Sequence, residues 1–270
     1  MKFKDNKTVI MGVLNVTPDS FSDGGQFFSI DYALARARQL VAEGADIVDI
    51  GGESTRPGSN AVDEDEELNR VAPVIEQLAR EITVPISIDT YKPAVANACL
   101  ERGAGMINDI SGLRYDNGKM LEVAAIHQVP VCIVHMQGLP KTMQQEPQYD
   151  DLVAGIKGFF SERIKVAKSA GIKDENIILD PGIGFGKTVE HNLILLQRLN
   201  EFSDLGFPLL IGTSKKSFIG KISDLPAEER LEGTIASNVL AVMMGAKIVR
   251  VHDVLEHKRA LEIIDAIESA

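Results

Sequence analysis

Short apolar runs alternate with amphipathic helical stretches along the whole chain, and this alternation limits the folds that the chain can adopt. Each run has the length of a β-strand, and the stretches between the runs carry apolar residues at the spacing of one helix face. The expected strands are eight, at residues 9–16, 47–50, 85–88, 106–107, 131–134, 177–179, 209–211 and 248–251. Strands this short and this apolar, each followed by a helix, predict a parallel sheet covered by helices.

Eight such units close a barrel of parallel strands, and the chain of 270 residues is near the ~250 residues typical of that fold. No linker or low-complexity segment divides the sequence, so we expect one domain over residues 1–270. The predicted fold is therefore α/β, a single (β/α)8 TIM barrel, with a doubly wound open sheet as the alternative. The polar, glycine-containing loops at residues 15–25 and 54–59 are expected to be mobile at the C-terminal mouth of the barrel.

Residues 177–187 (IILDPGIGFGK) show how one of these units ends. Pro181 stops the aliphatic strand and leaves Asp180 at its C-terminal end, and the alternating glycines that follow let the backbone pass close to a flat ligand. A phosphate-binding P-loop is not matched, because Pro181 stands where its first glycine is needed, although Lys187 fits the end of that pattern. The dinucleotide-binding pattern fails as well, since Lys187 takes the place of its last glycine. An ordinary strand-ending turn remains an alternative for this stretch alone.

Polar side chains recur at the C-terminal ends of the expected strands. In a barrel these ends converge on one mouth, so that residues far apart in the sequence come together there. One polar residue at a strand end is ordinary turn chemistry, but polar residues at nearly every end predict a binding site. The last two ends carry a lysine and an arginine, where barrels often bind phosphate. The candidate residues are Asn15, Thr55, Asp89, Asn108, Asp180, Lys216, Arg250 and His252.

The composition argues against several kinds of partner. A formal net charge of −11 at pH 7 disfavours nucleic acid or an anionic membrane as the main partner, although a small anionic substrate can still meet basic side chains in a site. The polar N-terminus indicates no signal peptide, and no apolar run reaches membrane-spanning length. Cys99 and Cys132 fall in a helix and a strand and are interpreted as reduced core thiols, which favours a cytoplasmic protein.

Four motifs together resemble the dihydropteroate synthase family. Residues 15–25 (NVTPDSFSDGG) look like the first family signature, and residues 49–58 (DIGGESTRPG) look like the second. Residues 179–185 (LDPGIGF) and 214–218 (SKKSF) look like two more, so that the resemblance spans nearly the whole chain. Lys215 departs from the arginine that is usual in the family, and the positive charge is kept.

The resemblance implies a reaction of folate biosynthesis. It implies that 6-hydroxymethyl-7,8-dihydropterin pyrophosphate condenses with p-aminobenzoate to give 7,8-dihydropteroate and pyrophosphate, a step that sulfonamides inhibit. It also implies Mg²⁺ as a cofactor, with Asn15 giving the one protein oxygen ligand, and a homodimer. Breaking the C–O bond leaves a pterin-stabilised cation that the amine attacks, so that no protein nucleophile is needed. Nearby carboxylates, Asp89 above all, would stabilise that cation electrostatically.

Each part of the substrates has matching residues. The pterin edge presents alternating donors and acceptors, which Asp89, Asn108, Asp180 and Lys216 can satisfy, and of these Asp89, Asp180 and Lys216 are the expected catalytic residues. Pyrophosphate needs charge-assisted donors and the metal ligand. The residues expected at pyrophosphate are Asn15, Thr55, Arg56, Arg250 and His252. Those expected at p-aminobenzoate are Phe21, Thr55, Pro57, Phe185 and Ser217.

Two other functions remain open on the sequence alone. A pterin-dependent methyltransferase domain shares the barrel and the pterin pocket, but the loops at residues 15–25 and 214–218 fit the synthase better, and the chain carries no cobalamin-binding companion domain. A non-catalytic pterin-binding module would keep the pterin residues, but it has no need for Arg56, Arg250 and His252.

Overall fold

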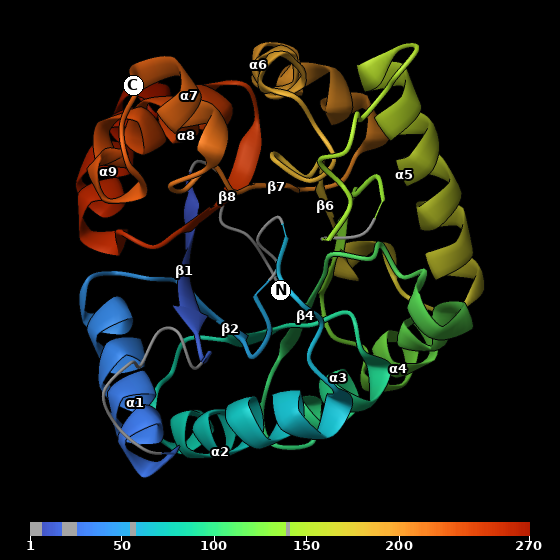
Figure 1. Ribbon diagram of the computed structural model, residues 1–270, viewed down its shortest axis with the longest axis vertical. Helices are drawn as coiled ribbons and strands as arrows, with labels where there is room; N and C mark the ends of the chain where they lie inside the picture. Colours follow the sequence, from blue (N-terminus) through green and yellow to red (C-terminus); the bar gives the residue numbers. More distant parts are fainter. Residues whose placement is uncertain (1–6, 18–25, 55–57, 139–140) are drawn as a thin grey trace.

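The strands form one closed barrel in the computed structural model, which describes residues 7–17, 26–54, 58–138 and 141–270. Within these residues each strand pairs in parallel with the next, and β8 returns to β1 (Figure 1). This closure confirms the predicted (β/α)8 barrel and excludes the open sheet. The strands are β1 (Val9–Asn15), β2 (Ile47–Gly51), β3 (Ile86–Asp89), β4 (Met106–Asp109), β5 (Val131–Val134), β6 (Ile177–Asp180), β7 (Leu209–Ile211) and β8 (Ala246–Val251).

The helices form a ring around the barrel, as Figure 1 shows. α2 begins after Asp63, whose carboxylate accepts a hydrogen bond from Glu66 N, and α3 begins with Pro93, which suits the first helical turn. The helices are α1 (Gln26–Ala42), α2 (Glu64–Glu81), α3 (Pro93–Leu100), α4 (Lys119–His127), α5 (Leu152–Ser169), α6 (Val189–Gln197), α7 (Ser217–Ser223), α8 (Leu231–Met243) and α9 (Val254–Glu268). Short 3-10 turns lie at η2 (Tyr115–Gly118), η3 (Asp174–Asn176), η4 (Leu199–Leu205) and η5 (Ala227–Glu229).

Two apolar layers hold this arrangement together. The larger layer lies between the outer face of the barrel and the helices, and the smaller one fills the barrel itself. Side chains alternate between the two faces of a strand, so every strand except β3 supplies both layers, and β3 supplies only the larger one. The strand residues in the inner layer are Met11, Ile47, Met106, Cys132, Val134, Ile178, Leu210 and Ile248.

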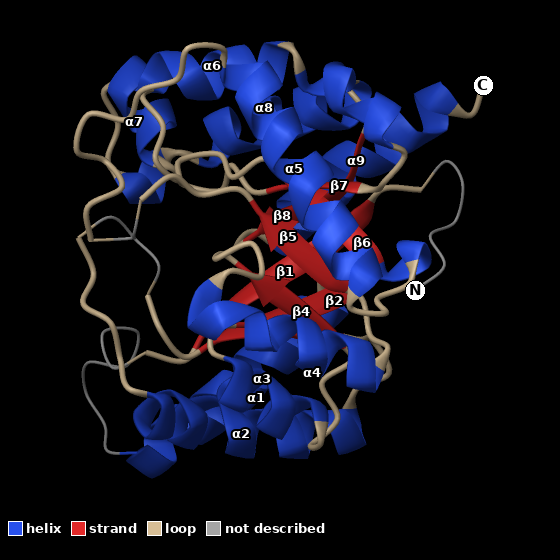
Figure 2. Ribbon diagram, turned by 90° about the vertical axis from the view of Figure 1, so that its right-hand side faces the viewer, coloured by secondary structure: helices blue, strands red, loops and turns tan. Residues whose placement is uncertain are grey.

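The inner face changes from apolar to polar toward the C-terminal ends of the strands. Two residues after the inner isoleucines of β2, β6 and β8 come Asp49, Asp180 and Arg250, and two residues after Met106 comes Asn108. A step of two residues keeps a side chain on the same face, so these polar groups stand above the packed interior. Long loops gather at one end of the barrel, on the left in Figure 2.

Candidate active site

The polar strand ends that were predicted for the site lie together at the mouth of the barrel. Asp89 and Asp180 are the last residues of β3 and β6, and Asn108 lies in β4, where it is paired in register with Asp89. Asp89 and Asp180 are each 7% exposed, and Asn108 is 3% exposed. Arg250 reaches the same place from β8. Two carboxylates, an amide and a guanidinium therefore share one small, largely dry region.

Arg250 joins this region through two ion pairs. Its Nε donates to Asp49 Oδ2 at 2.6 Å, and its Nη2 donates to Asp89 Oδ2 at 2.6 Å. Asn108 Nδ2 also donates to Asp49 Oδ2, at 3.1 Å. Asp49 is fully buried and was not among the predicted site residues. Its place two residues after the inward-facing Ile47 was the signal that could have found it.

Several acceptor atoms at this mouth carry no partner. In the part of the chain that the structure describes, the second carboxylate oxygens of Asp49 and Asp89 and the side-chain oxygen of Asn108 are buried and receive no hydrogen bond. Buried acceptors are nearly always satisfied in folded proteins, and leaving one unsatisfied costs about 1–3 kcal/mol. Three at one place are the expected mark of a site whose donors come from a ligand.

The charges at the mouth are shifted by burial and by one another. Burial raises the pKa of Asp89, and Arg250 opposes that shift. Burial also raises the pKa of Asp180, and the hydrogen bond from Gly182 N and the charge of Lys216 oppose that shift. For Arg250 burial alone would lower the pKa, but Asp49 and Asp89 raise it further than burial lowers it, so its charge is secure.

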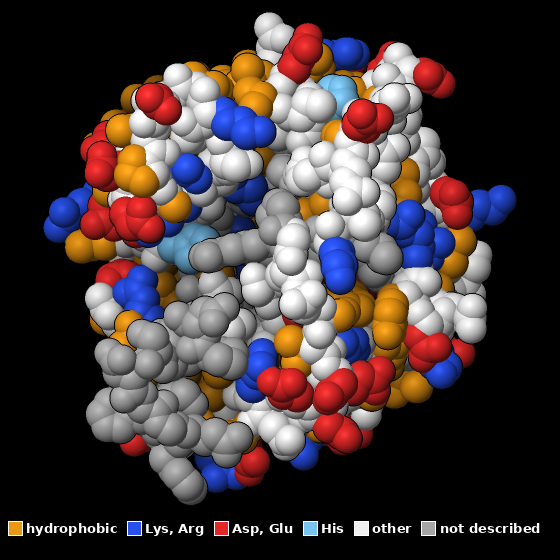
Figure 3. All heavy atoms as spheres, in the orientation of Figure 1, with side chains coloured by type: hydrophobic (Ala, Val, Ile, Leu, Met, Phe, Trp, Pro, Cys, Tyr) orange, Lys and Arg blue, Asp and Glu red, His pale blue; other side chains and the backbone are white. Residues whose placement is uncertain are grey.

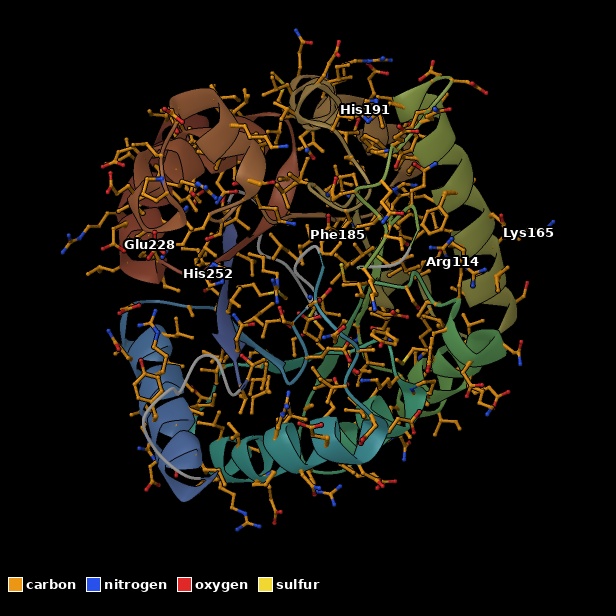
Figure 4. All side chains as sticks on the ribbon, viewed as in Figure 1. Arg114, Lys165, Phe185, His191, Glu228 and His252 are labelled. Carbon is orange, nitrogen blue, oxygen red and sulfur yellow. The ribbon has the colours of Figure 1, made fainter. Side chains whose placement is uncertain are left out.

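Lys216 and Phe185 face each other on one side of the site. Lys216 immediately precedes α7, and its Nζ donates to Ile183 O and lies 4.1 Å from the centre of the Phe185 ring. Burial lowers the pKa of Lys216 to about 8, although Asp180 opposes the shift. Phe185 lies over the centre of the barrel in Figure 4, and Ser217, the first residue of α7, is exposed. Phe185 and Ser217, two of the five residues expected at p-aminobenzoate, thus lie beside Lys216.

His252 directly follows β8 and lies to the left of Phe185 in Figure 4. His252 Nδ1 is 2.8 Å from Ser214 Oγ, which also accepts from His252 N at 3.2 Å. The neighbouring Lys215 forms an ion pair with Asp253 at 3.0 Å, so a carboxylate of the protein already balances its charge. On the face that Figure 3 shows, lysine, arginine and histidine side chains lie over α7, α8 and β8.

The remaining predicted residues are placed only in part. Asn15 ends β1 at the mouth, in register with Gly51, and is half-buried. The other four, Phe21, Thr55, Arg56 and Pro57, lie outside the residues that the structure describes.

Two of the glycines after Asp180 let the loop lie close to another segment of backbone, and their predicted approach to a flat ligand stays a prediction. A Cβ at Gly182 would lie 2.0 Å from His135 O, and one at Gly186 would lie 2.4 Å from Gln137 O. Both glycines have positive φ, 71° and 63° respectively, which other residues rarely adopt. The loop between β6 and α6 therefore packs against the segment that follows β5.

Other reactive side chains do not enter this site. Cys99 and Cys132 are free and buried, as expected for core thiols, and burial raises the pKa of both. Among the described residues no group of three His, Cys, Asp or Glu side chains could hold a metal ion. No helix in the described ranges is long and apolar enough to span a membrane.

Comparisons with known proteins agree with this geometry. The family model "Pterin binding enzyme" matches residues 11–252. The dihydropteroate synthase of Bacillus subtilis (strain 168) is 50% identical over 97% of this chain and 89% of the relative. That of Escherichia coli (strain K12) is 49% identical over 97% of this chain and 92% of the relative.

Two solved structures are similar to this protein in both fold and sequence. The Yersinia pestis dihydropteroate synthase in complex with a sulfonamide drug has a TM-score of 0.93 and 46% identity, covering 100% of this chain and 99% of that one. The Xanthomonas albilineans enzyme with 4-aminobenzoic acid has a TM-score of 0.92 and 44% identity, covering 98% and 94% of the two chains. By its barrel, by the polar groups at its mouth and by these similarities, the chain belongs to the dihydropteroate synthase family of pterin-binding enzymes.

Proposed function

We propose that this protein condenses 6-hydroxymethyl-7,8-dihydropterin pyrophosphate with p-aminobenzoate, giving 7,8-dihydropteroate and pyrophosphate. The observation that carries the proposal is the cluster of buried, partly unpartnered acceptors formed by Asp49, Asp89 and Asn108 beside Asp180 and Lys216. A pterin offers a row of N–H donors that such acceptors can receive, and a carbonyl that an ammonium can meet. A relative solved with 7,8-dihydropteroate bound supports this assignment.

Within this proposal Asp180, Asn108 and Lys216 bind the pterin ring and Asp89 faces the reacting carbon. The C–O bond to the leaving group breaks, and its electron pair departs with pyrophosphate. The amine nitrogen of p-aminobenzoate then forms the new C–N bond and loses a proton. Asp89 stabilises the pterin cation between these steps without a covalent bond, since the fixed carboxylate is already in place.

Arg250 and His252 receive the pyrophosphate. Arg250 is held beside the pterin groups by its pairs with Asp49 and Asp89, and His252 lies at the end of the same strand. Both are donors suited to a phosphate oxygen. Arg56 and Thr55, which the sequence assigns to the same anion, lie outside the described residues.

Mg²⁺ suits the oxygen ligands available at the mouth of the barrel. It is a hard ion that keeps several waters and leans on substrate phosphates, so it needs few protein ligands. Asn15 presents one amide oxygen donor at the end of β1, and the described residues hold no three-residue cluster that could bind the ion alone. When bound, the ion would neutralise charge on the pyrophosphate, and Asn15 would hold it.

The p-aminobenzoate site lies beside Lys216. Phe185 offers one face of its ring there, and Ser217 offers an exposed hydroxyl at the start of α7. Relatives solved with 4-aminobenzoic acid and with a sulfonamide drug support both ligands for this site. We expect sulfonamides to compete with p-aminobenzoate, and we place the reaction in the cytoplasm because both buried cysteines are free thiols.

We also propose that two copies of the chain associate through α6, α7 and α8. Four large apolar side chains on these neighbouring helices are exposed, namely Leu193, Ile222, Leu240 and Met243. The first three line one groove between the helices. An exposed apolar face of this kind suits a two-fold dimer.

A pyrophosphate-release assay with and without p-aminobenzoate tests the function. The proposal expects release that depends on p-aminobenzoate and yields dihydropteroate. Methyl transfer to or from a pterin would support the methyltransferase alternative. Pterin binding without any release would leave only a binding module.

A further inference from the structure

Lys187, at the end of the loop between β6 and α6, has no part in the reaction described above. It is 2% exposed, and its Nζ lies 3.0 Å from His135 Nδ1, 3.0 Å from Phe185 O and 3.4 Å from His135 O. An ammonium can only donate, so His135 Nδ1 accepts and the imidazole proton lies on Nε2. Burial, helped by Lys187 and Arg114, lowers the pKa of His135 to about 2, so the ring stays neutral.

The surroundings of Lys187 differ from those of Lys92, the other lysine this deeply buried in the described chain. Lys92 Nζ is 2.6 Å from Glu53 Oε2 and is paired with Glu67 as well. Within the described residues Lys187 has no ion pair, and all its partners are neutral. Burial therefore lowers the pKa of Lys187 to about 7, although Asp180 opposes that shift. A charge buried in this way weakens the fold, and such groups are commonly retained for function.

The loop that Lys187 holds leads directly to the substrate site. The carbonyl of Phe185 is bonded to Lys187, and the ring of the same residue faces Lys216 Nζ at 4.1 Å. The loop has other supports, because Tyr149 Oη donates to Gly186 O at 2.9 Å and Gly184 N donates to Asn192 Oδ1 at 2.7 Å. Neither of these bonds involves Phe185. Lys187 is thus the side chain that ties the backbone of Phe185 to the end of β5.

We propose that Lys187 is a positioning residue for the p-aminobenzoate site: held by His135, it fixes the Phe185 backbone and thereby sets the Phe185 ring beside Lys216. The proposal rests on the function proposed above. It predicts that loss of the ammonium harms the binding of p-aminobenzoate more than the binding of the pterin or the chemical step.

The test is Lys187→Met, which keeps a long unbranched side chain and removes the donors. We expect the KM for p-aminobenzoate to rise about tenfold, with kcat within about threefold and the affinity for a bare pterin, measured by calorimetry, within about threefold. The melting temperature should not fall, because the buried charge is gone. Lys165→Met, on the exposed outer side of α5 (Figure 4), is the matched control and should change none of these. An unchanged KM in folded Lys187→Met, or an equal loss for the pterin, overturns the proposal.

Substitution of His135 tests the same link without touching Lys187. His135→Asn can keep an acceptor near the position of Nδ1, whereas His135→Leu removes it. Asn should stay within about threefold of the unchanged protein in KM, and Leu should match Lys187→Met. If the two variants behave alike, or if Leu is without effect, the hydrogen bond from Lys187 does not set the site. This pair decides the matter even if Lys187→Met does not fold.

A measurement that needs no turnover separates this proposal from the proposed function. Amide hydrogen exchange over residues 182–187 should speed up in Lys187→Met and in His135→Leu, with little change in other segments. Faster exchange without any p-aminobenzoate-dependent activity in the unchanged protein would overturn the function and leave the loop contact standing. Unchanged exchange would overturn the role of Lys187 whatever the protein catalyses.

Discussion

Arg250 Nη2 donates to Asp89 Oδ2 at 2.6 Å, so the cation assigned to the leaving pyrophosphate is bonded to a carboxylate assigned to the pterin. Through Nε the same guanidinium also holds Asp49. In the proposed complex one ion-paired cluster would thus contact both halves of the pterin substrate. A change at Arg250 should affect both halves, but unequally, because the guanidinium itself is assigned to the pyrophosphate alone.

Arg250→Ala should weaken the pterin pyrophosphate at least tenfold more than the bare pterin, since the lost donors address the leaving group. It should also lower the free energy of unfolding by about 3–5 kcal/mol, because it leaves two buried carboxylates without their cation. Calorimetry with both ligands and denaturant titration measure these effects. Arg80→Ala, an exposed arginine paired with Glu76 on α2, is the control. Equal losses for the two ligands would make Arg250 a support of the barrel only.

Asp180→Ala should nearly abolish pterin binding. The carboxylate is buried at the end of β6 and is expected to receive two pterin N–H groups, each such bond to a charged group contributing ~1.5–3 kcal/mol. Calorimetry with a pterin that lacks pyrophosphate measures the loss. Asp174→Ala, an exposed aspartate paired with Lys168 near the other end of the same strand, is the control. Undiminished affinity in folded Asp180→Ala would remove this residue from the site.

The fold and the predicted polar strand ends followed from the sequence because both depend on short-range patterns. The predicted limits of the strands agree with those in the structure to within two residues, since each strand is an apolar run with a polar end. Asp49 was not predicted as a site residue because it lies inside a strand, where only the alternation of side chains after Ile47 shows that it faces inward. Lys187 and His135 could not be paired from sequence, because their contact depends on how two loops pack, 52 residues apart in the chain.

Met243→Glu should turn the proposed dimer into a monomer. This side chain is 63% exposed on α8, beside the apolar groove, and a charge there would be desolvated in the dimer. Sedimentation velocity over a range of concentrations gives the association state. Ile126→Glu changes a side chain that is 77% exposed on α4, outside the proposed interface, and should leave the state unaltered. A monomer before any substitution would show that the α6–α8 face serves another purpose.

Removal of Mg²⁺ by a chelator should slow pyrophosphate release and leave the binding of a bare pterin intact, because the pterin groups do not include the metal ligand. Asn15→Ala should raise the Mg²⁺ concentration needed for half-maximal rate about tenfold or more. Even loss of a residue that only supports a metal ligand typically lowers metal affinity or activity by about 10–100-fold. Asn15→Asp keeps an oxygen ligand and serves as the control. If chelation reduces pterin binding equally, the ion belongs to the pterin pocket and not to the leaving group.

Activity and stability should respond in opposite directions as pH rises above 8, because of Lys216. Its pKa is lowered by burial to about 8 from an ordinary value of 10.5. In the proposed site the protonated amine of Lys216 donates to the pterin, so kcat/KM for the pterin substrate should fall as pH rises through about 8. In the same range the unfolded chain binds more protons than the folded one, so the contribution of Lys216 to stability rises from about pH 8 to about pH 10.5.

Lys216→Met lacks this titration, and its stability relative to the unchanged protein should be greatest near pH 7–8 and decline toward pH 10.5. Lys216→Arg, which stays charged throughout, should lose the alkaline fall in kcat/KM even if its rate is low. Steady-state rates and denaturant titrations across pH 6.5–10.5 measure both trends, and an alkaline fall that persists in Lys216→Arg would assign it to another group.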